Sequence, residues 1–133
     1  MIYNRLYTHL EMNNILVSEQ FGFRMNHSTE QAAFSLINGI VTAMNNKQIF
    51  GGILCDLHKA FDTVQHNILL DKLQFYDIAG KFYSLIKSYL YNRYQKLSFE
   101  KTEYNKNSSE WEKINCGVPQ GSILGPLFFF CSI

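Results

Sequence analysis

The chain has 133 residues, of which 47% are hydrophobic and 15% are aromatic. This length and composition allow one small domain with a hydrophobic core and exclude a disordered chain. The net charge is only +1, so charge alone gives no sign of the basic face that nucleic-acid-binding proteins usually carry.

The N-terminal sequence and the cysteines indicate the cellular compartment of the protein. No apolar segment with a small-residue cleavage site begins the chain, so we predict an intracellular protein, in the cytoplasm, the nucleus or both. The apolar tail of residues 123–133 is shorter than the roughly 20 residues that span a bilayer, so we predict no membrane partner. Cys55, Cys116 and Cys131 have no metal-binding spacing, and we expect them to be reduced, buried thiols.

Apolar spacing predicts two helices in the first third of the chain. The first covers residues 2–16. A turn or a short extended piece is expected at Gln20–Arg24. Ser28 with Gln31 forms a capping box that starts a second helix, which runs to about Asn45. One face of this second helix is an apolar stripe with good helical spacing: Ala33, Phe34, Ile37, Ile40, Val41 and Met44.

The middle of the chain predicts a strand followed by two helices. The apolar run from Ile49 to Asp56 favours a buried strand that ends at Asp56. Helical spacing then recurs over residues 65–76 and again over residues 79–91.

The last third predicts a hairpin, a loop and a final helix. Strands are expected at Tyr94–Phe99 and Trp111–Cys116, with the polar stretch of residues 100–110 as the hairpin loop. Residues 117–121 are expected to form a loop, and a helix can start at Ser122. The order of elements predicts an α+β (mixed α/β) fold, a small antiparallel sheet packed by helices.

A carboxylate at the end of a strand can be held rigidly, and Asp56 has this position. Hard divalent ions such as Mg²⁺ take carboxylate oxygens together with substrate phosphates. Nucleotidyl transfer with two metals needs at least two converging carboxylates. Taken alone, Asp56 is more often a cap or turn residue than a metal ligand.

A second motif is the run Gly-Val-Pro-Gln-Gly-Ser-Ile-Leu-Gly-Pro at residues 117–126. It describes a rigid turn before a helix, whose N-terminal amides favour anions and nucleotides. Together with Asp-Leu-His-Lys-Ala-Phe-Asp at residues 56–62 and Gln-Phe-Gly-Phe-Arg at residues 20–24, this run resembles the reverse transcriptases of non-LTR (LINE-type) retrotransposons. Shorter matches at residues 64–66 and 92–95 extend the resemblance to nearly the whole chain.

The resemblance implies part of the fingers and palm of a right-hand polymerase, and it implies a role for each motif residue. Asp56 would bind the catalytic Mg²⁺ or Mn²⁺, and the backbone from Leu57 would cradle the incoming triphosphate. Phe61 would lie under the sugar and exclude a 2′-hydroxyl, although plain core packing is the alternative. Gln120 and Gly121 would position the templating base and the incoming nucleotide.

Four further residues are interpreted with the same resemblance. Arg24 is a candidate phosphate contact, with an exposed or structural arginine as the alternative. Asp62 is expected to cap the following helix, and Lys59 to be exposed or to meet phosphate. Asp77 stands where the family usually has a glycine, and we interpret it as a surface residue.

The implied function is RNA-directed DNA synthesis, with an RNA template, a DNA primer and dNTPs as partners. Residues 1–133 would be a partial reverse transcriptase domain, with an N-terminal segment, the Tyr-x-Asp-Asp carboxylates and the thumb outside it. With one metal-binding carboxylate, we expect weak metal binding or none, and no activity from this chain alone. The alternative is a non-catalytic nucleic-acid-binding or interaction module. We also expect Phe128, Phe129 and Phe130 to be exposed, and this C-terminal segment to favour aggregation or self-association.

Overall fold

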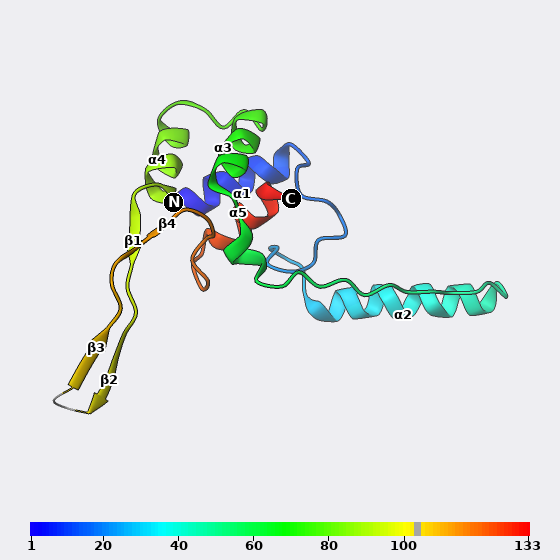
Figure 1. The fold of residues 1–133 in the computed structure, drawn as a ribbon. Coiled ribbons are helices and arrows are strands. Elements are labelled where there is room, and N and C mark those ends of the chain that lie inside the picture. The colour runs from blue at the N-terminus through cyan, green and yellow to red at the C-terminus, as the bar shows by residue number, and fades with distance from the viewer. Residues whose placement is uncertain (103–104) are drawn as a thin grey trace. The chain divides into compact units, whose positions relative to one another are not determined.

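The computed structural model describes residues 1–102 and 105–133. They form two compact units, one of Met1–Tyr7 with Lys59–Ile133 and one of Thr8–His58. None of the helices in the described ranges is long and apolar enough to cross a membrane. The elements are α1 (Ile2–Met12), α2 (Thr29–Asn45), the 3-10 helix η1 (Ala60–Thr63), α3 (His66–Phe75), α4 (Gly80–Leu90), β1 (Arg93–Gln95), β2 (Ser98–Thr102), β3 (Asn105–Ser108), β4 (Glu112–Ile114) and α5 (Gly125–Ser132) (Figure 1).

The core of the first unit lies between helices. α3 packs against both α4 and α5, and α5 also packs against η1. The buried side chains of α3 and α4 recur at helical spacing, as in amphipathic helices, whereas α5 is a short segment that is apolar on nearly all sides. The fully buried members of this core include Leu69, Leu73, Ile86, Leu90, Leu127 and Phe128.

The C-terminal aromatic residues do not form the exposed patch that was expected. Phe128 is fully buried, and its ring centroid lies 6.0 Å from that of Tyr89 in α4. Phe129 and Phe130 are half-buried, and the Phe129 ring centroid lies 5.4 Å from that of Phe61. The expectation of three exposed rings is therefore wrong, because α5 has partner helices within its own unit.

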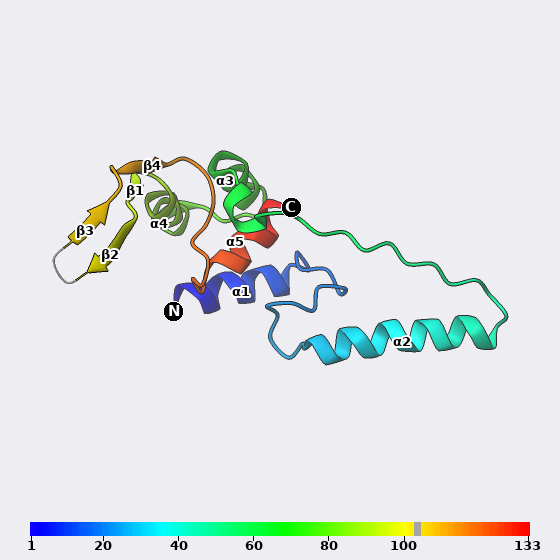
Figure 2. The ribbon, with the colours of Figure 1, turned by 60° about the horizontal axis from the view of Figure 1, so that its bottom comes forward.

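The strands form two two-stranded antiparallel sheets that follow one another along a hairpin, and this hairpin projects away from the helices of its unit (Figures 1 and 2). β1 pairs with β4, and β2 pairs with β3. The expected loop at residues 100–110 contains β3 and the end of β2, while residues 103–104 of that expected loop lie outside the described residues. The mixed helix and antiparallel strand content confirms the α+β class. The sheet is not packed by helices as expected, since the side chains of β1 and β4 are mostly exposed.

The capping box at the start of α2 is confirmed. The Ser28 Oγ accepts a hydrogen bond of 3.2 Å from the Gln31 amide, and the Gln31 Oε1 accepts one of 2.9 Å from the Ser28 amide. The apolar stripe of this helix is largely exposed. Phe34 and Met44 are 71% and 70% exposed, and Ala43 is the buried residue of α2.

The strand predicted at Ile49–Asp56 is also absent. The segment has no regular structure, and the side chains of Ile49, Ile53 and Leu54 are more than 90% exposed. A strand forms where a neighbour satisfies its N–H and C=O groups. Within the described ranges, no segment pairs with these residues.

The cysteines are free in the structure, and only one of them is buried as predicted. Cys55 and Cys116 are exposed, whereas Cys131 is fully buried in α5. Burial raises the pKa of the Cys131 thiol to about 12, an effect that the charge of Lys72 partly opposes.

Candidate functional site

The backbone of the first unit joins the two motifs singled out in the sequence. The Gly117 amide donates a hydrogen bond of 2.7 Å to the Val64 carbonyl, and the Val118 amide donates one of 2.9 Å to the Phe61 carbonyl. These bonds attach the Gly-Val-Pro-Gln-Gly loop to the segment that ends the Asp-Leu-His-Lys-Ala-Phe-Asp motif. The two motifs therefore form one local structure.

Gly117 is needed at this junction for two reasons. Its φ is +85°, and a Cβ added there would lie 3.1 Å from the Cα and the carbonyl oxygen of Asp62. Such contacts are closer than real Cβ atoms normally show, so a side chain would push the two segments apart. The buried His66 adds a further bond from Nε2 to the Gly117 carbonyl at 2.8 Å. Because a carbonyl only accepts, Nε2 carries the proton.

The other end of the loop is fixed by Ser122. Its Oγ donates to the Pro119 carbonyl at 2.7 Å and accepts a hydrogen bond of 3.0 Å from the Gly125 amide, where α5 begins. The helix therefore starts three residues after the predicted Ser122. Gln120 and Gly121 lie exposed between these fixed points, and Gly121 has a φ of +77°, which glycine adopts at little cost.

A pocket of about 360 Å³ lies beside this loop. It brings Gln120 together with Asp62 and with residues of the hairpin. Its lining consists of Asp62, Arg93, Gln95, Ile114, Cys116, Gly117, Val118, Pro119 and Gln120.

The predictions made for Phe61 and for Asp62 have different outcomes. Phe61 is half-buried against Phe129, a contact that agrees with the packing alternative, while its role under a sugar stays a prediction. The capping role predicted for Asp62 is wrong. Asp62 lies within η1, and the residue before α3 is Gln65. The short 3-10 helix separates the motif from the helix that Asp62 was expected to cap.

Asp56 and Leu57 belong to the second unit, whereas Phe61, Gln120 and Gly121 belong to the first. Both Asp56 and Leu57 are exposed, and the Asp56 carboxylate forms no hydrogen bond or ion pair with the described part of the chain. No group of three or more metal-binding side chains occurs among the described residues. Asp56 alone therefore supplies the two oxygens of one carboxylate, which are fewer ligands than a divalent metal ion requires.

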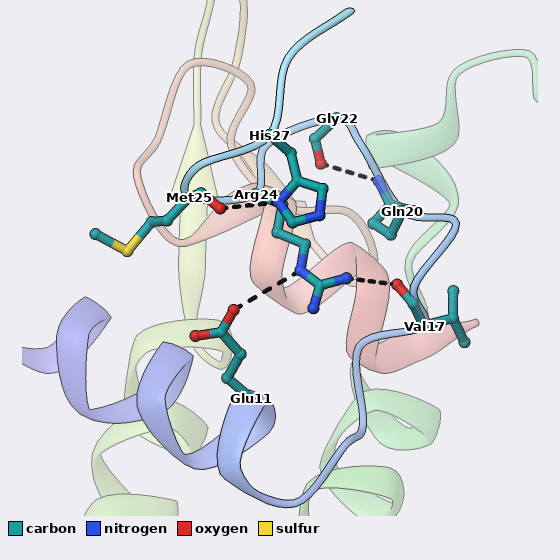
Figure 3. Close-up of polar contacts among 7 residues, drawn as sticks. All are labelled: Glu11, Val17, Gln20, Gly22, Arg24, Met25 and His27. Carbon is teal, nitrogen blue, oxygen red and sulfur yellow. Dashed lines mark hydrogen bonds and ion pairs between the residues drawn. The ribbon is translucent and has the colours of Figure 1, made fainter. Parts of the chain in front are cut away.

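Arg24, the predicted phosphate contact, is held by its own unit (Figure 3). Its Nη1 donates to the Val17 carbonyl at 2.7 Å, and its Nε lies 3.8 Å from the Glu11 carboxylate. The side chain is only 14% exposed. These contacts give Arg24 a structural role, in which it ties the turn of residues 17–24 to the end of α1. A phosphate contact by Arg24 stays a prediction.

Sequence reasoning assigned no role to His66 and Arg93, although both lie in short matches to the family pattern. His66 fixes the loop, and Arg93 lines the pocket. A polar residue beside a strand or a helix start is too common a pattern to identify such roles. Only the contacts between distant segments identify them.

Comparison with known proteins agrees with the resemblance. Residues 1–133 match the family model described as reverse transcriptase (RNA-dependent DNA polymerase). The chain is 34% identical over 130 residues to the probable RNA-directed DNA polymerase from transposon BS of Drosophila melanogaster, an alignment that covers 97% of this chain and 14% of that protein.

Two further Drosophila melanogaster proteins give similar matches. The RNA-directed DNA polymerase from mobile element jockey is 34% identical over 129 residues, and the probable RNA-directed DNA polymerase from transposon X-element is 33% identical over 128. These alignments cover 97% and 94% of this chain and 13% of each relative, so the chain spans a small part of the relatives' length. No solved structure matches the chain. The family match over residues 1–133 shows that this chain belongs to the reverse transcriptase family.

Proposed function

We propose that residues 1–133 form part of the fingers and palm of a right-hand RNA-directed DNA polymerase of a non-LTR retrotransposon. The observation that carries this proposal is the junction of Gly117 and Val118 with Val64 and Phe61. Polymerisation requires groups from separate segments to be held in a fixed geometry. The junction supplies such a geometry for the two motifs on which the family resemblance depends.

Each motif residue has a role in this proposal. The backbone near Leu57 holds the incoming triphosphate, and Phe61 excludes a 2′-hydroxyl from the sugar position by shape. Gln120 and Gly121 position the templating base and the incoming nucleotide, a role that suits their exposure between two fixed ends of the loop.

The family generally uses divalent metal ions, and Mg²⁺ or Mn²⁺ is the proposed ion. Asp56 is the residue of this chain that would hold it, because its carboxylate is exposed and has no described partner. When bound, the ion stabilises the charge that develops on the transferred phosphoryl group. At least two carboxylates are needed for that chemistry. We therefore expect a polypeptide limited to residues 1–133 to synthesise no measurable DNA.

The test is primer extension on an RNA template with a DNA primer, using the longest natural polypeptide that contains this sequence. Asp56→Ala is expected to abolish synthesis. Asp71→Ala removes an exposed carboxylate from α3 and is expected to leave synthesis unchanged. Synthesis that persists in Asp56→Ala would overturn the proposed role of Asp56, and synthesis absent from the unaltered polypeptide would overturn the activity. The alternative, a non-catalytic binding or interaction module, is not favoured, since all three relatives are named as polymerases.

A further inference from the structure

The peptide unit that joins Gly117 to Val118 is held on both of its sides. Its carbonyl accepts a hydrogen bond of 2.8 Å from Nε2 of His66, and its amide donates one of 2.9 Å to the Phe61 carbonyl. A trans peptide is planar, and its carbonyl and N–H point in opposite directions. Two hydrogen bonds on opposite sides therefore fix the rotation of this peptide as well as its position.

His66 is itself held firmly enough to act as a fixed donor. It is the first residue of α3, its side chain is 5% exposed, and its ring centroid lies 6.1 Å from that of Tyr91. The Tyr91 hydroxyl in turn donates a hydrogen bond to Oδ1 of Asn67, the next residue of α3. A side chain whose rotamer is locked by its neighbours holds its own partner more precisely than a mobile one does.

The orientation of this peptide relates two parts of the proposed nucleotide site. Phe61 accepts the hydrogen bond from one side, and the chain continues from Val118 to Gln120 and Gly121 on the exposed part of the loop. Phe61 is the residue proposed to exclude a 2′-hydroxyl by shape, while the loop is proposed to position the nucleotide. Exclusion of a single hydroxyl group requires these two parts to be held within about 0.5 Å of their productive geometry.

The imidazole supplies one of the two hydrogen bonds that set this geometry. Without it the Gly117 carbonyl loses its donor, and the remaining bond from Val118 to Phe61 lets the peptide rotate about its own direction. The loop could then move away from the Phe61 ring without breaking the backbone junction. More space at the sugar position would admit a ribonucleotide.

We propose that His66 is a positioning residue for sugar selection by the polymerase. Through its hydrogen bond to the Gly117 carbonyl it holds the loop at a fixed distance from Phe61, so that deoxynucleotides are accepted and ribonucleotides are rejected. His66 contacts neither substrate nor metal ion in this role, because it acts through the peptide between Gly117 and Val118. The inference rests on the proposed function, to which it adds the residue that keeps Phe61 and the loop together.

The test is primer extension with the longest natural polypeptide that contains this sequence, comparing kcat/KM for dCTP with kcat/KM for CTP. His66→Met keeps an apolar side chain of similar volume at this buried position but has no N–H donor. We expect it to lower the ratio of the two values about tenfold, the equivalent of one lost hydrogen bond. A merely structural role would lower both values alike. An unchanged ratio in His66→Met would therefore overturn the proposal.

Two amide variants identify the hydrogen bond as the cause. His66→Gln carries an N–H donor at nearly the reach of the histidine Nε2 and is expected to retain most of the selectivity. His66→Asn carries the same amide on a shorter side chain and is expected to lose selectivity as His66→Met does, so it serves if the methionine variant does not fold. Circular dichroism checks the folding of each variant. Equal ratios in the Gln and Asn variants would contradict a role for the bond.

Tyr91→Phe is the matched control. It removes the hydroxyl that bonds to Asn67 but keeps the ring beside His66, and it is expected to leave the ratio unchanged. A fall as large as that of His66→Met would show that any disturbance near the start of α3 has this effect, and would overturn the specific role of His66. Unaltered polypeptide that makes no DNA would overturn the proposed function together with this inference. DNA synthesis with unchanged selectivity in His66→Met would overturn the inference alone.

Discussion

The Gly117 amide and the Val64 carbonyl are 2.7 Å apart, and this hydrogen bond joins two segments that are far apart in the sequence. The loop that contains Gln120 thereby takes its position from the segment that contains Phe61. The separate motifs that carry the family resemblance therefore belong to one local structure in this unit.

Replacing Gly117 tests how strongly the junction depends on a residue without a side chain. Gly117→Ala introduces a Cβ at 3.1 Å from the Asp62 backbone and forces alanine to a φ of +85°. We expect the free energy of unfolding to fall by about 1–3 kcal/mol, measured by urea denaturation. Gly51→Ala is the control, because no atom lies within 4 Å of the added Cβ. Equal effects of the two substitutions would contradict the close approach.

Asp77 is a position where glycine is expected to stabilise the protein. It follows the end of α3 with a φ of +60°, while the Ile78 amide donates to the Leu73 carbonyl at 2.9 Å, as at a helix end with a left-handed residue. Asp77→Gly is expected to raise the free energy of unfolding by about 0.5–1 kcal/mol. Asp71→Gly, in the interior of α3, is expected to lower it by roughly 0.3 kcal/mol, because aspartate is itself a poor helix former. Urea denaturation that gives both changes the same sign would contradict this account.

Elements with strong local signals could be predicted from the sequence. The pair Ser28 and Gln31 specified the start of α2, because both partners of a capping box lie within one turn. α3 and α4 were predicted to within two residues at each end, since an amphipathic stripe is a property of the segment itself. The surface position of Asp77 also agrees with its exposure.

Burial and strand formation could not be predicted in the same way. The run from Ile49 to Leu54 has strand composition, yet a strand also requires a neighbour, which the composition of one segment does not reveal. The exposure of Phe34 and the burial of Phe128 have the same cause, because burial depends on which elements pack together. The role of His66 depends on its contact with Gly117, and Arg93 lines a pocket together with Asp62 and Gln120, all of them distant in the sequence.

The burial of Phe128 predicts a large effect on stability. Phe128→Ala leaves a cavity between α5 and α4 and removes the contact with Tyr89. We expect the free energy of unfolding to fall by about 3–5 kcal/mol, measured by chemical denaturation. Phe34→Ala, at a side chain that is 71% exposed, is expected to change it by less than about 1 kcal/mol. Similar losses from the two variants would contradict the packing of α5.

Cys131 predicts a loss of stability at alkaline pH. Burial raises its pKa from 9.0 to about 12 in the folded state. Between these values the folded chain binds more protons than the unfolded chain, so the free energy of unfolding falls as the pH rises. The contribution is complete below about pH 9 and decreases above it by up to about 1.4 kcal/mol per pH unit.

Urea denaturation at several pH values from about 8 to about 10.5 measures this decrease. Cys131→Ala is expected to be less stable at every pH, because it removes buried volume, but to show a flatter pH dependence. Cys116→Ala removes an exposed thiol and is expected to keep the steep dependence. The comparison uses the slope and not the absolute stability, because each variant differs from the unaltered chain by a single thiol. A Cys131→Ala variant that loses stability as steeply as the unaltered chain would show that a different group causes the alkaline transition.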